Sequence, residues 1–499
     1  MTYEDDIAST DPETRASALI ERAIEAEQAG DSDSALADLV EAEAVAAEAG
    51  LAGLQVAALI NRGWVASNRD DQEEAATLYR HAVDLSREHE DLEHLRPALA
   101  NLAVALRSLK RYEEAVKVYD DLLLMVEDSP SEALPAHTDR GLCLLELEDF
   151  EQATESLHKA EALAAEAGNG EVVMIVANAL GMAYERNLDP GSAVPMYLKA
   201  AKAARELGDE PQLVQALVGL AESHRALEAY TEADAAYTEA ESILQGEAHK
   251  PQRAEVMYWH ATALAAAGQS DSALELWRAE EALRRELGQG VDLADNLLAQ
   301  AGVLRTRRET DALPALYDEA EALYRVGDAE KGIADVLYWR AMMARRQGDS
   351  AGCRDFIAQV VEISDRIGYP KMQVQGRGLY AMALADLGET EAADAELDTA
   401  DEKCVLLGYD YLAVWMFARR AYVYACEGRA AEELTAQLQK AFDRANMTGF
   451  MTVGRTAVRA LTAEIKARCG DAYNEALDAL QDEIAVDWRE TPAPEAAEA

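Results

Sequence analysis

The stretch that decides the fold runs from Ala179 to Ala200 and reads ALGMAYERNLDPGSAVPMYLKA. The small residues Gly181 and Ala193 stand twelve positions apart, on either side of a polar turn. Tyr197 follows four positions after Ala193. This spacing predicts two helices that cross where neither residue has a bulky side chain, with the aromatic ring filling the space beside the crossing.

The same pattern recurs along nearly the whole chain, so we expect an internal repeat. The small residue of the second helix returns every 38 to 41 residues. It is found at Ala35, Ala75, Ala115, Ala153, Ala193, Ala233, Ala273, Ala312, Cys353 and Ala393. Its partner in the first helix stands twelve residues earlier at most repeats. In the eighth repeat the pair Ala301 and Ala312 is only eleven residues apart, which predicts a displacement by one residue there.

Turn residues mark the ends of the expected helices. Glycines that follow fifteen residues after the second-helix small residue suit a helix C-terminus, because the left-handed cap conformation disfavours a Cβ. They are Gly50, Gly168, Gly208, Gly288, Gly327, Gly368 and Gly408. Within each repeat, acidic residues such as Asp71, Asp149 and Asp349 can cap the second helix. Each unit of about 40 residues is therefore helix, turn, helix, turn.

About twelve such units predict an all-α fold, an α-solenoid whose helix-turn-helix repeats form a superhelix. We expect the repeat array to cover residues 12–484. The first segment, 1–11, and the acidic tail, 485–499, are expected to be disordered. Two turn-rich segments, 128–131 and 245–251, predict slight kinks in the array.

These repeats resemble the tetratricopeptide repeat family. The small-residue pairs Gly63 with Ala75 and Gly181 with Ala193 match that family, and so does an aromatic residue four positions after the second Ala, such as Tyr79. The period of about 40 residues is longer than the family's usual 34. The resemblance implies a right-handed superhelix with a groove made chiefly of first helices. It also implies binding of a protein or peptide partner and leaves the ligand open.

Composition limits the function classes. The 499 residues include 94 acidic and 46 basic ones, for a net charge of −48. This charge disfavours binding to nucleic acid or to an anionic membrane, and no run of residues is apolar and long enough for membrane insertion. The N-terminal 50 residues are especially acidic, which predicts a solvated surface or else a dock for a basic partner.

Cysteine usage and the N-terminus favour a cytoplasmic location. The five cysteines are far apart, without a CxxC pair, which predicts reduced thiols rather than a disulfide framework or a zinc site. The N-terminal sequence MTYEDDIAST has neither a basic stretch nor an apolar core, so we expect no signal peptide. The 35 arginines against 11 lysines, with abundant alanine, indicate a bacterial or archaeal coding bias.

The later repeats carry the candidate binding residues. Aromatic and arginine residues gather on their first helices, and both types are enriched at binding hot spots. We predict that a partner binds at Tyr258, Trp259, Arg305, Arg308, Tyr338, Trp339, Arg345, Arg346, Trp415, Arg419 and Tyr422. The alternative is structural: the aromatic residues pack between repeats and the arginines pair with nearby carboxylates.

A second set of arginines stands directly before the first-helix small residue. We expect their stems to lie on core surface and their guanidinium groups to bond to a carboxylate or a helix end. They are Arg22, Arg62, Arg140, Arg340 and Arg420.

The sequence offers no catalytic residues and implies no cofactor or metal site. The segment from Gly348 to Gly352 fits the GxSxG motif of hydrolases. That motif needs a preceding strand and a later histidine. Here a helix precedes it and all eight histidines come before residue 261, so we predict a turn. The regular small-residue pairs also disfavour a helical toroid glycosidase.

The leading hypothesis is a non-catalytic scaffold or adaptor that binds a peptide or a helix of a partner protein in its groove. The alternative is a regulatory protein whose superhelix changes shape when a ligand or peptide binds. A further hypothesis is self-association through the ends, because Ile484 and Val486 extend an apolar terminal segment.

Overall fold

Acidic residues and glycines set the ends of the helices in the computed structural model, which describes residues 3–483. The carboxylates of Asp71, Asp149 and Asp349 each accept a hydrogen bond from a backbone N–H three residues later, at 3.0, 3.1 and 2.8 Å. These bonds satisfy donors that have no partner within the helix. The segment that fits GxSxG is therefore a turn, with Asp349 capping the helix that begins at Ser350.

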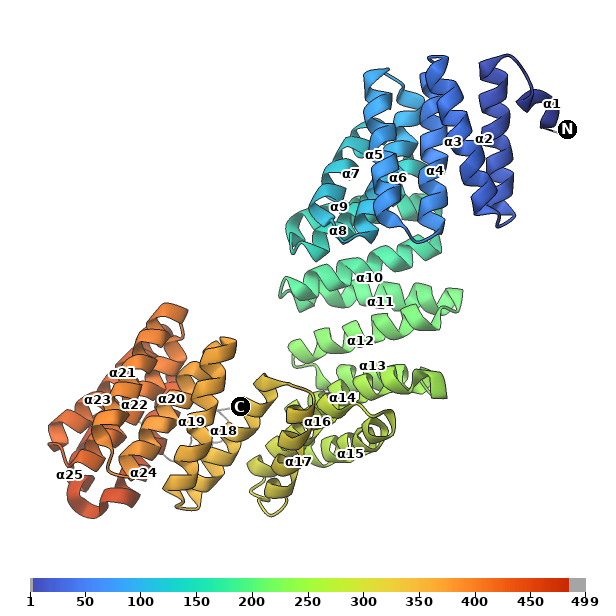
Figure 1. The fold of residues 1–499 in the computed structure, drawn as a ribbon. Coiled ribbons are helices and arrows are strands. Elements are labelled where there is room, and N and C mark those ends of the chain that lie inside the picture. Colours follow the sequence, from blue (N-terminus) through green and yellow to red (C-terminus); the bar gives the residue numbers. More distant parts are fainter. Residues whose placement is uncertain (1–2, 484–499) are drawn as a thin grey trace. The chain divides into compact units, whose positions relative to one another are not determined.

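Helices α2 to α25 follow one another as consecutive helix-turn-helix pairs, and no strand occurs in the described residues (Figure 1). The all-α solenoid fold that the sequence predicts is confirmed. The chain divides into two compact units between Leu244 and Gln245. This division falls at the turn-rich segment 245–251, which the sequence marks as a possible kink.

Unit 1 ends at Leu244 and begins with the short helix α1 (Glu4–Ile7). Its first helices are α2 (Pro12–Gln28), α4 (Ala52–Asn68), α6 (Leu92–Ser108), α8 (Pro130–Glu146), α10 (Gly170–Arg186) and α12 (Glu210–Ala226). Its second helices are α3 (Ser32–Glu48), α5 (Gln72–Glu88), α7 (Tyr112–Val126), α9 (Phe150–Ala167), α11 (Pro190–Leu207) and α13 (Tyr230–Ile243). The sequence predicts disorder for residues 1–11, but α1 forms within this segment. Just before α1, the Tyr3 hydroxyl donates a hydrogen bond of 2.6 Å to the Glu25 carboxylate of α2.

Unit 2 starts at Gln245 with a single turn of 3₁₀ helix, Glu247–His249. Its first helices are α14 (Lys250–Ala266), α16 (Gly290–Thr306), α18 (Glu330–Arg346), α20 (Pro370–Asp386), α22 (Asp410–Glu427) and α24 (Met451–Cys469). Its second helices are α15 (Ser270–Leu287), α17 (Leu313–Val326), α19 (Ser350–Ile367), α21 (Thr390–Leu407), α23 (Ala431–Thr448) and α25 (Asn474–Glu483). The predicted acidic tail, 485–499, lies outside the described residues.

The small residues lie where the helices of a pair cross, as the sequence predicts. A Cβ on Gly181 would lie 2.7 Å from the ring of Tyr197, and one on Gly63 would lie 2.6 Å from the ring of Tyr79. The aromatic residues after the second-helix alanines are core residues: Tyr79, Tyr119, Tyr197, Tyr237 and Trp277 are all buried. Each ring therefore occupies space that the missing side chain leaves open.

The eighth repeat corrects two sequence-based expectations. Ala312 is exposed before the start of α17, and Leu313 is buried, twelve residues after Ala301. The pair therefore keeps its spacing, with a larger second residue. Gly327 has a φ of −90°, and the left-handed conformation falls on Asp328 instead. Glycine is required at Gly327 for space, because a Cβ there would lie 2.4 Å from the side chain of Val291.

Ion pairs join first helices to second helices at the arginines beside the crossings. Arg22 pairs with Asp38 through two contacts of 2.7 Å. The other four arginines of this set bind carboxylates in the same way: Arg62 on Glu43, Arg140 on Asp120, Arg340 on Glu321 and Arg420 on Asp401. Their predicted structural role is confirmed.

Buried thiols take the place of other small core residues. Cys353 occupies the crossing position of the ninth repeat and is fully buried. Cys143 and Cys404 are buried in the same manner, and all five cysteines are free. Burial raises the pKa of the Cys143 thiol, and likewise that of Cys353 and that of Cys404, to about 12.

The left-handed backbone conformation of Leu188, in the turn between α10 and α11, leads to a prediction about stability. Leu188 has a φ of 57° and its side chain is 89% exposed. A left-handed conformation costs an L-residue about 1–2 kcal/mol, and no packing would be lost. Leu188→Gly should therefore raise the free energy of unfolding by about 0.5–1 kcal/mol in urea, after the entropy of the unfolded glycine is subtracted. In contrast, Leu198→Gly on the exposed face of α11 should lower it by about 1 kcal/mol. A loss in both variants would contradict the role of backbone strain.

Candidate functional site

Two aromatic pairs predicted to bind a partner lie on first helices of unit 2. Tyr258 and Trp259 are neighbours on α14, and Tyr338 and Trp339 are neighbours on α18, 80 residues later. In each pair the ring centroids are 5.3 Å apart in an edge-on arrangement, with interplanar angles of 79° and 81°. The two repeats therefore build the same local geometry.

The two pairs differ in exposure. Tyr338 is buried and Trp339 is half-buried, because Arg305 of α16 places its guanidinium 3.4 Å from the centroid of the Trp339 ring. Trp259 instead keeps 41% of its surface exposed. The structure thus covers Trp339 with Arg305, beside the buried Tyr338, and leaves Trp259 open.

A third predicted group lies inside the fold. Trp415, Arg419 and Tyr422 of α22 are buried. The guanidinium of Arg419 donates to the carbonyl oxygen of Gln375 on α20 over 3.1 Å. Packing of α22 against α20 and α24 covers these side chains, so they have a core role rather than a surface one.

Arg345 is joined to the same part of the core. Its guanidinium lies 4.9 Å from the Tyr422 ring centroid and pairs with Asp386 at 3.2 Å and with Glu464 of α24 at 2.6 Å. Helix α24 therefore occupies the predicted binding position beside Arg345. The remaining two predicted residues, Arg308 and Arg346, are exposed at the ends of α16 and α18.

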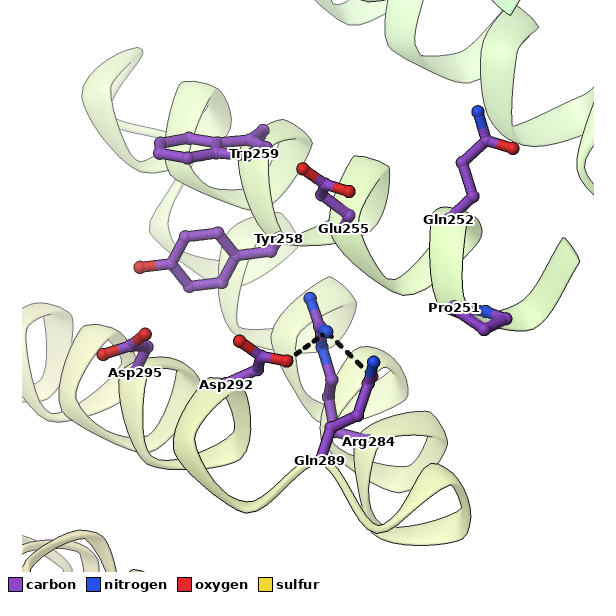
Figure 2. A pocket seen from close by; sticks show the side chains of 9 residues that line it. All are labelled: Pro251, Gln252, Glu255, Tyr258, Trp259, Arg284, Gln289, Asp292 and Asp295. Carbon is purple, nitrogen blue, oxygen red and sulfur yellow. Dashed lines mark hydrogen bonds and ion pairs between the residues drawn. The ribbon is translucent and has the colours of Figure 1, made fainter. Parts of the chain in front are cut away.

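A cavity of about 490 Å³ opens beside Trp259 between α14 and α16 (Figure 2). Figure 2 shows Glu255, Tyr258 and Trp259 on α14, with Asp292 and Asp295 on the facing α16. Pro251, Gln252, Arg284 and Gln289 complete its lining. We call this cavity the Trp259 pocket.

Arg284, which lines the Trp259 pocket, forms an ion pair with a buried carboxylate behind it. Glu280 of α15 has no exposed surface and accepts a hydrogen bond of 2.5 Å from Arg284. Arg284 also donates to Gln289 over 2.8 Å and to Asp292 over 2.9 Å. Two carboxylates thus surround one guanidinium, and the positive charge of Arg284 is already balanced.

The other carboxylates give the pocket a negative character. Glu255 is exposed, one helical turn before Trp259. Asp295 accepts a hydrogen bond of 2.5 Å from the Tyr324 hydroxyl, and its burial raises the pKa of its carboxyl. Burial, with a contribution from the charge of Asp295, raises the pKa of Tyr258 to about 12. The pocket is therefore suited to a cationic group with an apolar or planar part.

Sequence reasoning found two of the nine lining residues, Tyr258 and Trp259. It missed the carboxylates, since acidic residues are abundant throughout the chain. The position of Glu255, four residues before Trp259 and so on the same helix face, is the signal that could have found one of them. The lining includes no serine, cysteine, histidine or lysine, and among residues 3–483 no group of metal-ligating side chains comes together.

Comparison with known proteins agrees with the predicted resemblance. Residues 98–133 match the family model for the tetratricopeptide repeat. The resemblance to this family is therefore confirmed for this segment, which lies within an array of consecutive helix pairs. No curated protein matches the sequence.

Solved structures with similar helix pairs are distant in sequence. A tetratricopeptide repeat protein from Parabacteroides merdae is 18% identical, with a TM-score of 0.36, covering 54% of this chain and 93% of its own. The quorum sensor NprR from B. thuringiensis is 15% identical, with a TM-score of 0.47, covering 69% and 97%. A signal-transduction ATPase with a tetratricopeptide repeat sensor, from Pyrococcus horikoshii, is 12% identical, with a TM-score of 0.43, covering 82% and 55%.

A helix that crosses a bilayer needs about 20 consecutive, mainly apolar residues. Within the part of the chain that the structure describes, no helix has both the length and the hydropathy to cross a membrane.

Proposed function

We propose that the protein is a non-catalytic scaffold or adaptor that binds a peptide segment of a partner protein on the first helices of unit 2. The observation that carries this proposal is the exposed Trp259 at the edge of the Trp259 pocket. Tryptophan is costly to leave in water and is enriched among residues that dominate binding energy. The pocket supplies space for one or two side chains of an extended segment.

The chemistry of the lining supports binding rather than turnover. The pocket offers carboxylates, an indole, a phenol and amides. Its one guanidinium is held by Glu280 and Asp292. The net charge of −48 favours a partner segment with positive charge and disfavours nucleic acid. A cytoplasmic location is part of the same proposal.

The proposal predicts a strong effect of Trp259→Ala. A photo-crosslinking amino acid in place of Gln252, at the pocket, should capture a discrete partner in cells that make the protein. Trp259→Ala should remove this adduct and weaken binding of the captured segment by about thirtyfold, since loss of an anchoring tryptophan costs about 2 kcal/mol or more. Affinity is measured with the purified full chain and the captured segment.

Two matched controls belong to this experiment. The crosslinker in place of Glu402, on the exposed face of α21, should not capture the same partner. Leu406→Ala, which removes another exposed apolar side chain from α21, should leave the affinity unchanged. Equal capture from both positions, or capture that survives Trp259→Ala, would contradict a binding site at the pocket.

The regulatory alternative makes a different prediction for the same captured segment. A regulator whose shape changes on peptide binding should change its X-ray scattering profile when that segment is added. A scaffold should bind with an unchanged profile.

A further inference from the structure

We propose that the Trp259 pocket binds an arginine side chain of the partner segment, with its guanidinium stacked on the Trp259 indole and paired with Glu255. This inference rests on the proposed function and names the chemistry of the residue that is recognised. It follows from a comparison of the two Tyr–Trp pairs within unit 2.

In the second pair, Tyr338 and Trp339, an arginine of the chain itself covers the tryptophan. Arg305 lies over Trp339 with its guanidinium carbon 3.4 Å from the ring centroid, at the distance of close stacking. A planar guanidinium is attracted to the negative face of an indole and loses little hydration there. The chain therefore contains its own example of an arginine stacked on the tryptophan of such a pair.

The first pair has the same arrangement without the arginine. Trp259 meets Tyr258 in nearly the same edge-on geometry as Trp339 meets Tyr338. Within the described residues of unit 2 no guanidinium lies over Trp259, and 41% of this residue remains exposed. The exposed indole of Trp259 therefore corresponds to the indole of Trp339, which Arg305 covers.

A carboxylate stands one turn before the tryptophan in both repeats. Asp335 precedes Trp339 and accepts a hydrogen bond of 3.1 Å from the Tyr369 hydroxyl. Glu255 precedes Trp259 at the equivalent position and is exposed at the pocket. A cation that enters the pocket can therefore pair with Glu255 beside the indole.

The remaining charges of the pocket favour the same occupant. Arg284 is neutralised by the buried Glu280 and by Asp292, so Glu255 and Asp295 leave the lining with an excess of negative charge. Asp295 already accepts a hydrogen bond from the Tyr324 hydroxyl, which leaves Glu255 as the more available partner. A guanidinium can donate to a carboxylate while its plane stays on the indole, whereas an ammonium lacks a plane to stack.

The experiment selects peptides from a random phage library on the purified full chain and removes those that still bind the Trp259→Ala variant. The peptides that depend on Trp259 should be enriched in arginine at one position. Replacing that arginine by citrulline, its neutral isostere, should weaken binding about tenfold, and replacing it by lysine should weaken it less.

A charge variant of the protein tests the pairing separately. Glu255→Gln should weaken the arginine peptide about fivefold and leave the citrulline peptide unchanged. Glu402→Gln, at an exposed site on α21, is the matched control and should change neither. Circular dichroism spectra of the variants test whether they remain folded.

The outcomes separate the two proposals. Trp259-dependent peptides without a common arginine, or citrulline peptides of equal affinity, would overturn the arginine inference while the binding function stands. Peptides that carry acidic or aromatic residues at the Trp259-dependent position would overturn it in the same way. If no selected peptide depends on Trp259, both the inference and the site of the proposed function are wrong.

Discussion

Arg284→Met is expected to lower the free energy of unfolding by about 4 kcal/mol at neutral pH, because it leaves the buried Glu280 without its cation. Methionine retains much of the volume of the arginine stem, so the loss reports charge rather than packing. Urea unfolding, followed by hydrogen exchange of the amides in α15 and α16, measures the effect within unit 2.

The pH dependence of this loss identifies its cause. Burial already raises the pKa of Glu280 above its ordinary 4.5, and loss of Arg284 should raise it further. An acid whose folded-state pKa is raised loses stability as the pH rises from the unfolded value to the folded value. The difference between Arg284→Met and the wild type should therefore be smallest near pH 4.5 and largest at neutral pH.

A double variant is the control. Arg284→Met with Glu280→Gln removes both charges and should recover about half of the loss, because the remaining amide can still bond with Asn296. A loss that is independent of pH, or a double variant less stable than Arg284→Met, would contradict a charge effect.

Gly219→Ala is expected to lower the free energy of unfolding by about 3 kcal/mol, although alanine is the better helix former. A Cβ on Gly219 of α12 would lie 2.3 Å from the ring of Tyr197. Gly181 of α10 contacts the same ring from another helix, so the ring has no free space to move into. Hydrogen exchange of α10 to α12 during urea unfolding measures the loss.

The matched variant is Gly302→Ala in α16. Gly302 is also within a helix, but nothing lies within 4 Å of a Cβ built there. Alanine should therefore raise stability at this position by about 0.5–1 kcal/mol. The same sign at both sites would show that helix propensity, not contact with Tyr197, decides the outcome.

Residue spacing was enough to predict the fold because each crossing leaves its own mark on the sequence. Gly181, Ala193 and Tyr197 identify one helix pair, and the mark returns in the next pair. In the eighth repeat the sequence places the crossing one residue early, at Ala312, because Leu313, a large side chain, occupies the position of the small residue. The spacing of Gly327 matches that of the other glycines and so predicts a left-handed conformation. The structure instead requires glycine there because a Cβ would clash with the side chain of Val291.

The candidate site could be predicted only in part. Aromatic and arginine residues on first helices give the same sequence pattern whether they face solvent or are covered by another helix. Trp415 and Tyr422 look like Trp259 in the sequence, but α20 and α24 enclose them in the structure. The carboxylates of the Trp259 pocket come from α14 and α16, and no local pattern shows that Asp295 lies opposite Tyr258.

The buried thiols have a consequence for how the array can be studied over time. Cys143 in unit 1 and Cys353 in unit 2 are sealed within their helix pairs, and a reagent that attacks thiolates reaches them only after the pair has opened. The labelling rate of each cysteine therefore reports how often its own helix pair opens. Their separate labelling times would record which of the two units opens first, without any probe added to the protein.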